Sequence, residues 1–287
     1  MRSSGFGGVG PRALLKRAGQ DFLRDDMMTH AAALAYHVLL ALFPFVIFLL
    51  TLLGALGLPS FFDWLLGQAR IALPPDAFGL VERVISQVRG RSHGGLLSFG
   101  IVAALWAASA GVRSLMTALN VAYDVTESRP AWRRYLLSIV YTVGLAIMLM
   151  VAAGLMLLGP QVVGWLAEQA GIGSTFVTLW TWLRWPVAAL LLLIAVAVVY
   201  YVAPDVDQPF RVVTPGSVLA VVAGIVGSLG FSFYVAHLGN YGATYGSLGS
   251  VIVLLLYFFL ASLALLLGAE VNAVIHHAQT GEPAEGR

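Results

Sequence analysis

Long stretches without charged side chains recur along the chain. A helix needs about 20 mainly apolar residues to cross the hydrocarbon core of a bilayer. The last uncharged stretch, residues 212–269, is long enough for two such helices, and glycines at 239, 242, 246 and 249 divide it. The predicted spans cover 30–58, 95–118, 136–159, 184–203, 215–236 and 250–273. The pattern therefore predicts an all-α fold, a polytopic membrane helical bundle with six transmembrane helices in a single membrane domain over residues 1–287.

Two further segments have the periodicity of amphipathic surface helices. Residues 11–26 predict one such helix before the first span. In the connection 60–93, apolar residues recur at helical spacing after two prolines, namely Phe78, Val81, Val84, Ile85 and Val88. We expect this amphipathic connection to lie on the membrane surface or to cap the bundle. A packed lid is the favoured interpretation, and a partner-binding site is the alternative.

Composition excludes most other classes of protein. Hydrophobic residues make up 59% of the chain and charged residues 10%, whereas a soluble domain has about 45–50% and about 25%. The mean hydropathy of +0.87 agrees with a membrane protein. A chain without cysteine cannot be a disulfide scaffold. The net charge of +2 is too small to indicate a nucleic-acid partner.

The distribution of basic residues predicts the orientation in the membrane. An even number of spans places both termini on one side, and ten Lys and Arg residues fall on that side against five on the other. Arginine supplies 15 of the 16 basic residues, which is typical of GC-rich bacterial genomes. We therefore expect a multi-pass protein of the bacterial inner membrane with cytoplasmic N- and C-termini. The N-terminal segment 1–29 and the tail 277–287 are then cytoplasmic, and the connection 60–93 is extracytoplasmic.

Motifs of soluble enzymes are missing from the sequence. It has no phosphate-binding loop, no His-Glu-x-x-His motif and no group of carboxylates near a histidine. His276 and His277 form a lone pair without the further ligands that a zinc site needs. We therefore predict no catalytic residues, no metal site and no cofactor, and we predict that the protein is not an enzyme.

Polar side chains within the spans are the candidate functional residues, because ionisable groups in a bilayer are costly and usually face a cavity or a partner. Arg113 and Glu270 lie at similar predicted depth toward the cytoplasmic end, so we expect them to form an ion pair. The alternative is that each charge reaches the membrane interface separately. If they do not meet, Arg113 is free to bind a phosphate or carboxylate, and Glu270 a proton or cation. The same candidate polar site includes His37, Tyr36, Asn120 and Asn272.

Two glycine-containing patterns carry further predictions. Gly216, Ala220, Gly224, Ser228 and Ser232 fall at every fourth position of the fifth span, and such stripes let helix backbones approach closely. The neighbouring helix is expected in the same chain, with a homo-oligomer left open. A broken segment at the outer membrane boundary supplies the other candidate residues, which are Asn240, Tyr241, Tyr245 and Gly246. A tight turn is its favoured interpretation, and a cavity lining is the alternative.

Three segments resemble the YihY/BrkB family of bacterial inner-membrane proteins, once named ribonuclease BN. They are AAALAYHVLLALFPFVIFLL (31–50), LWAASAGVRSLMTALNVAYDVTESRPAWRR (105–134) and NYGATYGSLGSVIVLLLYFFLASLALLLGAEVNA (240–273). The resemblance implies six spans with both termini cytoplasmic and a suspected transport role, and the ribonuclease name is regarded as mistaken. His37 stands where the family pattern has an aromatic such as Tyr. This departure weakens any role for His37. A single histidine in a membrane helix more often donates a hydrogen bond to a neighbouring helix than relays protons, and that interpretation is favoured here.

Three functional hypotheses follow. The first is a transporter or a protein that handles lipids or other amphiphiles in the bacterial envelope, with membrane lipids or an unknown small solute as its partners. The second is a non-catalytic scaffold or assembly partner, and the third is a membrane-bound hydrolase or ribonuclease, which the missing catalytic motifs disfavour. A polar cavity that reaches the membrane midplane would favour transport, whereas a tightly packed apolar interior would favour a scaffold.

Overall fold

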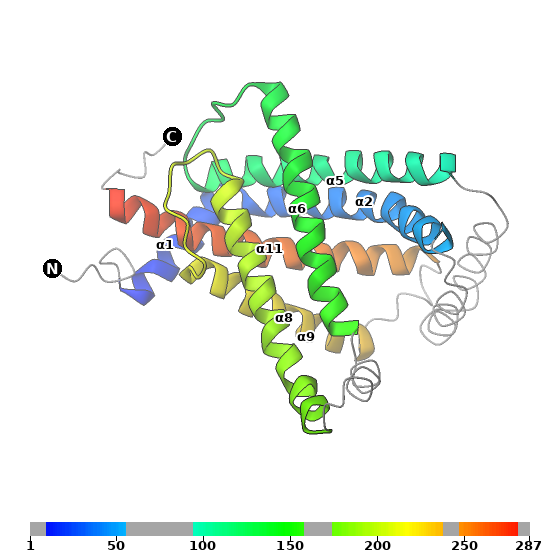
Figure 1. Cartoon of the computed structure of the whole chain (residues 1–287). Coiled ribbons are helices and arrows are strands. Elements are labelled where there is room, and N and C mark those ends of the chain that lie inside the picture. The colour runs from blue at the N-terminus through cyan, green and yellow to red at the C-terminus, as the bar shows by residue number, and fades with distance from the viewer. Residues whose placement is uncertain (1–9, 56–93, 158–173, 238–246, 281–287) are drawn as a thin grey trace.

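The computed structural model describes residues 10–55, 94–157, 174–237 and 247–280, and its secondary structure there is helical (Figure 1). The connection 60–93 and the candidate residues Asn240, Tyr241, Tyr245 and Gly246 lie outside the described residues. The all-α class and the helical membrane bundle are confirmed. The helices are α1 (Pro11–Arg24), α2 (Met27–Ala55), α5 (Gly94–Ala122), α6 (Ala131–Leu157), α8 (Ser174–Val202), α9 (Pro215–His237) and α11 (Ser247–Thr280).

Five of these helices contain stretches that are long and apolar enough to cross a membrane. Within the described part of the chain, these stretches are Val102–Ala122, Ala131–Leu149, Thr178–Val202, Pro215–His237 and Val251–Thr280. Helix α2 has a shorter apolar stretch, Met27–Leu42. The number of six spans therefore stays a prediction.

Two helices are longer than the charge pattern indicated. Helix α8 begins at Ser174, ten residues before the predicted start, so Arg184 lies inside the helix, where its guanidinium lies 5.6 Å from the centre of the Trp185 ring. Helix α11 continues to Thr280, so His276 and His277 are helical and do not lie in a tail. A single arginine or a histidine pair leaves the backbone hydrogen bonds of a helix intact, because only proline removes a backbone donor.

The helices contact one another in a closed ring. Neighbours follow the order α2, α5, α6, α8, α9 and α11, and α11 also contacts α2, which completes the ring. In Figure 1, α6 and α8 cross the direction of α2, α5 and α11 steeply. Helix α1 has the predicted amphipathic character and packs on α11, burying Leu14 and Ala18 against Val271 and Ile275.

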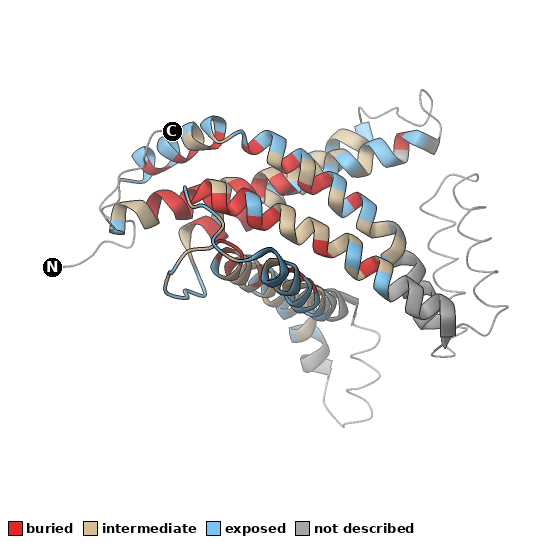
Figure 2. Cartoon of the chain, turned by 90° about the horizontal axis from the view of Figure 1, so that it is seen from above, coloured by how far each residue is buried: buried red, intermediate tan, exposed pale blue. Residues whose placement is uncertain are grey.

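The packed core lies at one end of this ring, which we name the polar end. The polar end comprises residues 10–34, 115–134, 200–220 and 264–280, and it includes the start of α1 and the end of α11 in Figure 1. The main cluster of buried residues joins the start of α2 to the ends of α5, α8 and α11, and it includes Met27, Met116, Tyr123, Tyr200 and Leu266. Figure 2 shows exposed and half-buried residues along the more distant parts of the same helices.

Helices α9 and α11 approach each other most closely at two glycines. A methyl group added at Gly268 would overlap the carbonyl oxygen of Gly216, and it would lie 2.5 Å from the Tyr200 hydroxyl. That hydroxyl donates a hydrogen bond to the carbonyl oxygen of Leu265 on α11, so α8 is tied to the same crossing. Ala220 also faces this contact, and its Cβ would lie 2.7 Å from the added methyl. Only glycine leaves room for three helices at this point.

We predict that Gly268→Ala destabilises the bundle by about 1–3 kcal/mol, because overpacking a filled contact forces backbones apart. Thermal unfolding in detergent, followed by circular dichroism, measures the change. Gly224→Ala on α9 is the matched control, since nothing lies within 4 Å of the added methyl. An alanine there should be neutral or stabilising by up to about 1 kcal/mol. Equal melting temperatures for the two variants would contradict the close crossing.

We predict that the polar end faces the cytoplasm. Of the ten Lys and Arg residues that the structure describes, eight lie at or beside this end, and they are Arg12, Lys16, Arg17, Arg24, Arg129, Arg133, Arg134 and Arg211. Single cysteines at Thr126, Thr280 and Ser174 test the orientation in this cysteine-free chain. In intact cells, an impermeant thiol reagent should label only position 174, at the start of α8. Labelling at 126 or 280 from outside would reverse the orientation.

Candidate functional site

A large apolar cavity lies within the helix bundle, and it is open on one side, where Val38, Phe45 and Leu149 are 39–46% exposed. It has a volume of about 530 Å³ and lies between α2, α5, α6 and α11. Small residues on three of these helices leave the space open, namely Ala41, Ala108, Gly111 and Ala146. The volume lies within the range of about 300–1,000 Å³ that is usual for ligand sites. A second apolar space of about 200 Å³ between α5, α6 and α8 shares Val112, Leu115 and Leu145 with it.

Two of the three polar residues on the cavity wall bond to their own helices. The Thr142 hydroxyl donates to the carbonyl oxygen of Ser138 at 2.6 Å. The Nδ1 atom of His37 lies 2.7 Å from the carbonyl oxygen of Ala33, which is one turn earlier on α2. Ser262 is the remaining polar residue of the lining, and it is buried. The wall therefore presents a mainly apolar surface to anything inside the cavity.

His37 also lines a second cavity, which we name the basic pocket. This pocket has a volume of about 550 Å³ and lies where α5 ends and α6 begins. Its charged lining residues are Arg113, Arg129, Arg134 and Glu127. The apolar cavity and the basic pocket are therefore neighbours, with His37 in the wall of both.

Arg113 is held in the basic pocket by neutral groups. Its Nη1 donates to the hydroxyls of Ser109 at 3.0 Å and Ser138 at 3.1 Å. The guanidinium lies 4.2 Å from the centre of the Tyr135 ring, a distance at which a cation is attracted to the ring face. Among the described residues, no carboxylate lies within ion-pair distance of Arg113. The predicted ion pair with Glu270 is therefore wrong.

Glu270 lies on a different side of the polar end. The side chain of Glu270 is 1% exposed, and its Oε1 has no hydrogen-bond partner in the described structure. The charges that act on it come from α1 and its turn into α2, where Asp21, Arg24 and Asp25 are found, and from Asp124. The two residues have similar predicted depth, but Arg113 points from α5 to α6. Depth in the membrane was therefore not sufficient to predict contact.

Asn120 joins the α5–α6 connection to the segment that follows α8. Its side-chain nitrogen donates to Glu127 at 3.0 Å, and its oxygen accepts from the backbone N–H of Asp205 at 2.8 Å. Asp205 also accepts hydrogen bonds from the backbone and hydroxyl of Ser128, at 2.8 and 2.6 Å. Arg129 lies between the two carboxylates, 2.5 Å from Glu127 and 3.6 Å from Asp205. We name this set the carboxylate cluster.

The carboxylates of this cluster are stabilised in their charged form. Burial favours the neutral acids, but the hydrogen bonds and charges outweigh it. The bonds from Arg129 and Asn120 lower the pKa of Glu127 below its ordinary value. The bonds from Ser128 and the charge of Arg129 lower the pKa of Asp205 in the same way. The cluster fixes the α5–α6 connection against the segment that follows α8.

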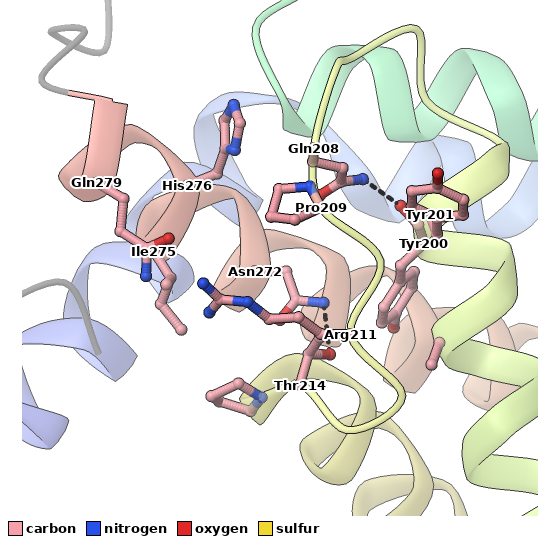
Figure 3. Close-up of a pocket in the computed structure, with 12 residues that line it drawn as sticks. Tyr200, Tyr201, Gln208, Pro209, Arg211, Thr214, Asn272, Ile275, His276 and Gln279 are labelled. Atoms are coloured by element: carbon pink, nitrogen blue, oxygen red, sulfur yellow. Dashed lines mark hydrogen bonds between the residues drawn. The ribbon is translucent and has the colours of Figure 1, made fainter. Parts of the chain in front are cut away.

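Asn272 on α11 binds the start of α9 through two hydrogen bonds. Its side-chain oxygen accepts from the N–H of Gly216 at 2.9 Å, and its nitrogen donates to the Thr214 hydroxyl at 2.9 Å (Figure 3). The backbone N–H of Thr214 donates to the Ser217 hydroxyl, and the backbone N–H of Ser217 donates to the Thr214 hydroxyl. The N–H groups of the first turn, which have no partner within the helix, are thus hydrogen-bonded. The pocket drawn in Figure 3 has a volume of about 60 Å³, far below the usual size of a ligand site.

The remaining candidate residues from the sequence do not form one site in the structure. Tyr36 is 55% exposed on α2 and contacts His37 edge to face at 5.7 Å. In the stripe of small residues, Gly216 and Ala220 face α11 of the same chain, whereas Gly224 has open space beside it. Ser228 lies 3.2 Å from the Tyr257 hydroxyl, and Ser232 is exposed.

Sequence reasoning missed most of the basic pocket. Arg129, Arg134 and Glu127 follow the end of α5 and were counted only as cytoplasmic charge or as part of the family segment. Their signal was the density of arginines in Ser128–Arg134 directly beside an intramembrane arginine. The apolar cavity had a weaker signal, since small residues in membrane helices usually mark tight packing and not space.

Comparisons with known proteins place the chain in a family. The family model described as Virulence factor BrkB matches residues 18–287. The chain belongs to the BrkB family. This result confirms the resemblance derived from the sequence, and it identifies the chain as a membrane protein with several apolar helices. No solved structure matches the chain.

Individual relatives carry two kinds of name. A protein of Bacillus subtilis (strain 168) named as ribonuclease-like protein YfkH is 39% identical over 264 residues, covering 92% of this chain and 95% of the relative. A UPF0761 membrane protein of Xanthomonas campestris (strain B100) is 28% identical over 267 residues, covering 87% of this chain. Another, from Xanthomonas axonopodis, is equally similar. The chain spans 57–58% of the length of these Xanthomonas relatives.

We predict that acid destabilises the carboxylate cluster. A carboxylate whose pKa is lowered by folding contributes stability above its unfolded pKa, about 3.9 for Asp and 4.3 for Glu, and loses it as the pH falls through the lower folded value. The melting temperature in detergent should therefore fall between about pH 5 and pH 3.

Asp205→Asn should lower stability at pH 7 by about 1 kcal/mol and make the melting temperature less dependent on pH in this window. The exposed Asp207 provides the control, and Asp207→Asn should change neither quantity. The same pH profile for wild type and Asp205→Asn would show that the cluster does not stabilise the fold.

Proposed function

We propose that the protein is a lipid-handling membrane transporter that binds an amphiphile with its apolar chain in the apolar cavity. The observation that carries this proposal is the apolar space of about 530 Å³ between α2, α5, α6 and α11, next to the basic pocket. A space of this size and lining suits an apolar chain better than a hydrated solute.

The scaffold hypothesis has less support. It expects a tightly packed interior, whereas close packing in the described residues is concentrated at the polar end. The interior also differs from the polar cavity expected for a hydrophilic solute, since the lining is apolar apart from His37, Thr142 and Ser262. An amphiphile fits both observations, and membrane lipids are the available source. We further propose that the protein is not an enzyme and that it resides in the bacterial inner membrane.

Ala146→Phe tests the proposal by filling the cavity from α6. We expect the purified variant to retain much less tightly bound lipid than the wild type, measured by mass spectrometry of lipid extracted from protein in mild detergent. Ile147→Phe is the matched control, because Ile147 is the next residue, is 52% exposed and does not line the cavity. It should retain the wild-type amount of lipid.

A second measurement tests transport itself. Wild-type protein in phospholipid vesicles should move a fluorescent lipid between leaflets, Ala146→Phe should do so more slowly, and Ile147→Phe should match the wild type. If Ala146→Phe folds normally and retains as much lipid as Ile147→Phe, the cavity is not a lipid site and the proposal fails.

A further inference from the structure

The basic pocket has the composition of a site for an anion. It adjoins the apolar cavity at His37. A molecule that occupies both spaces would therefore have an apolar chain in the cavity and a polar headgroup at the arginines. This inference rests on the proposed function, because the chain of such a molecule would lie in the cavity. The residues of the basic pocket indicate the chemistry of the headgroup.

The arginines of the pocket differ in how their charges are balanced. Arg129 is paired with both Glu127 and Asp205. Arg134 lies 3.5 Å from Glu127, which is a contact between charges but too long for a good hydrogen bond. Arg113 has no carboxylate within ion-pair distance among the described residues. The one glutamate of the pocket is thus shared by two arginines and leaves the third charge unbalanced.

The geometry prepares Arg113 to bind an anion. Ser109, Ser138 and the Tyr135 ring fix its guanidinium, and both serines contact the same nitrogen, Nη1. Within the described structure, Nε and Nη2 have no hydrogen-bond partner, and these atoms form one edge of the planar fork that binds two oxygens of a carboxylate or phosphate. An unbalanced cation inside a membrane helix is costly unless a partner compensates it.

Arg134 places a second cation over the same turn of α5. Its Nη2 donates to the carbonyl oxygen of Arg113 at 3.0 Å and to the Thr117 hydroxyl at 2.5 Å. The two guanidinium groups therefore line one wall of the pocket, with Tyr135 beside them. Two cations in fixed positions favour a group with several negatively charged oxygens over a zwitterion or a neutral hydroxyl.

We propose that the basic pocket binds the anionic phosphate or carboxylate headgroup of the amphiphile, with Arg113 as the principal donor and Arg134 as the second cation. Binding neutralises Arg113 and joins the headgroup to the chain in the apolar cavity. The same chemistry would suit a free anion, so the experiment must separate a lipid headgroup from a small ion.

The experiment measures binding of three probes to full-length protein in detergent by native mass spectrometry and calorimetry. The probes are a short-chain phosphatidic acid, the diacylglycerol with the same chains, and inorganic phosphate. The variants are Arg113→Gln, Arg113→Lys and Ala146→Phe. Arg133→Gln is the matched control, since Arg133 is an exposed neighbour on α6 that does not line the pocket.

We expect phosphatidic acid to bind more tightly than either of the other probes. Arg113→Gln should weaken it about tenfold or more, because a charge-assisted pair of hydrogen bonds is lost. Arg113→Lys should lie between the two, since it keeps the charge but not the fork. Arg133→Gln should bind like the wild type, and diacylglycerol binding should be unchanged in Arg113→Gln.

Three outcomes would overturn the inference. One is an equal loss of phosphatidic acid and diacylglycerol binding in Arg113→Gln, which would make the arginine structural. Another is inorganic phosphate that binds as tightly as phosphatidic acid, which would make the site one for a free anion. The last is unchanged phosphatidic acid binding in Arg113→Gln while Ala146→Phe weakens it, which rejects the headgroup site alone. If Ala146→Phe changes neither lipid, the proposed function itself fails.

Discussion

The contact between Gly216 and Gly268 is the constraint on which the rest of the bundle depends. It brings α9 against α11 with backbone nearly touching backbone, and the Tyr200 hydroxyl adds α8 to the same point. In a bilayer, apolar side chains gain little by leaving lipid, so close backbone packing and buried hydrogen bonds stabilise helix association. Both occur at the polar end, where Asn272 binds the start of α9. Away from this end the described helices are less closely packed, and apolar space lies between them.

This division between a packed end and a hollow interior relates structure to the proposed activity. A protein that admits a lipid must open a path for it without losing its fold. The carboxylate cluster and the glycine crossing hold the helix ends together, so the apolar walls formed by α5 and α6 need not supply the stability themselves. Arg113 lies at the boundary of the two regions, fixed by hydroxyls and an aromatic ring and not by a carboxylate.

Much of the fold could be predicted from the sequence, because uncharged stretches report the length of membrane helices directly. The fifth predicted span, 215–236, differs from α9 by a single residue. Charges were less reliable as boundaries: Arg184 lies within α8, where an aromatic neighbour accommodates it. The site was harder to predict, since helical pattern gives depth and face but not the rotation of one helix against another. Arg113 and Glu270 have matching depth, yet they point to different neighbours.

Arg113 also gives the protein an electrical property. The residue lies inside the candidate span Val102–Ala122, so part of the membrane potential falls between the polar end and its guanidinium. Moving one elementary charge across a whole membrane at 100 mV changes its free energy by about 2.3 kcal/mol. A charge that crosses only part of the potential changes its free energy by the same fraction of this value. An anion entering the basic pocket would therefore respond to voltage. While the anion is paired with Arg113 the two charges cancel at the site, but Arg113 stays fixed on α5, so an anion that moves onward carries its charge through the remaining part of the potential.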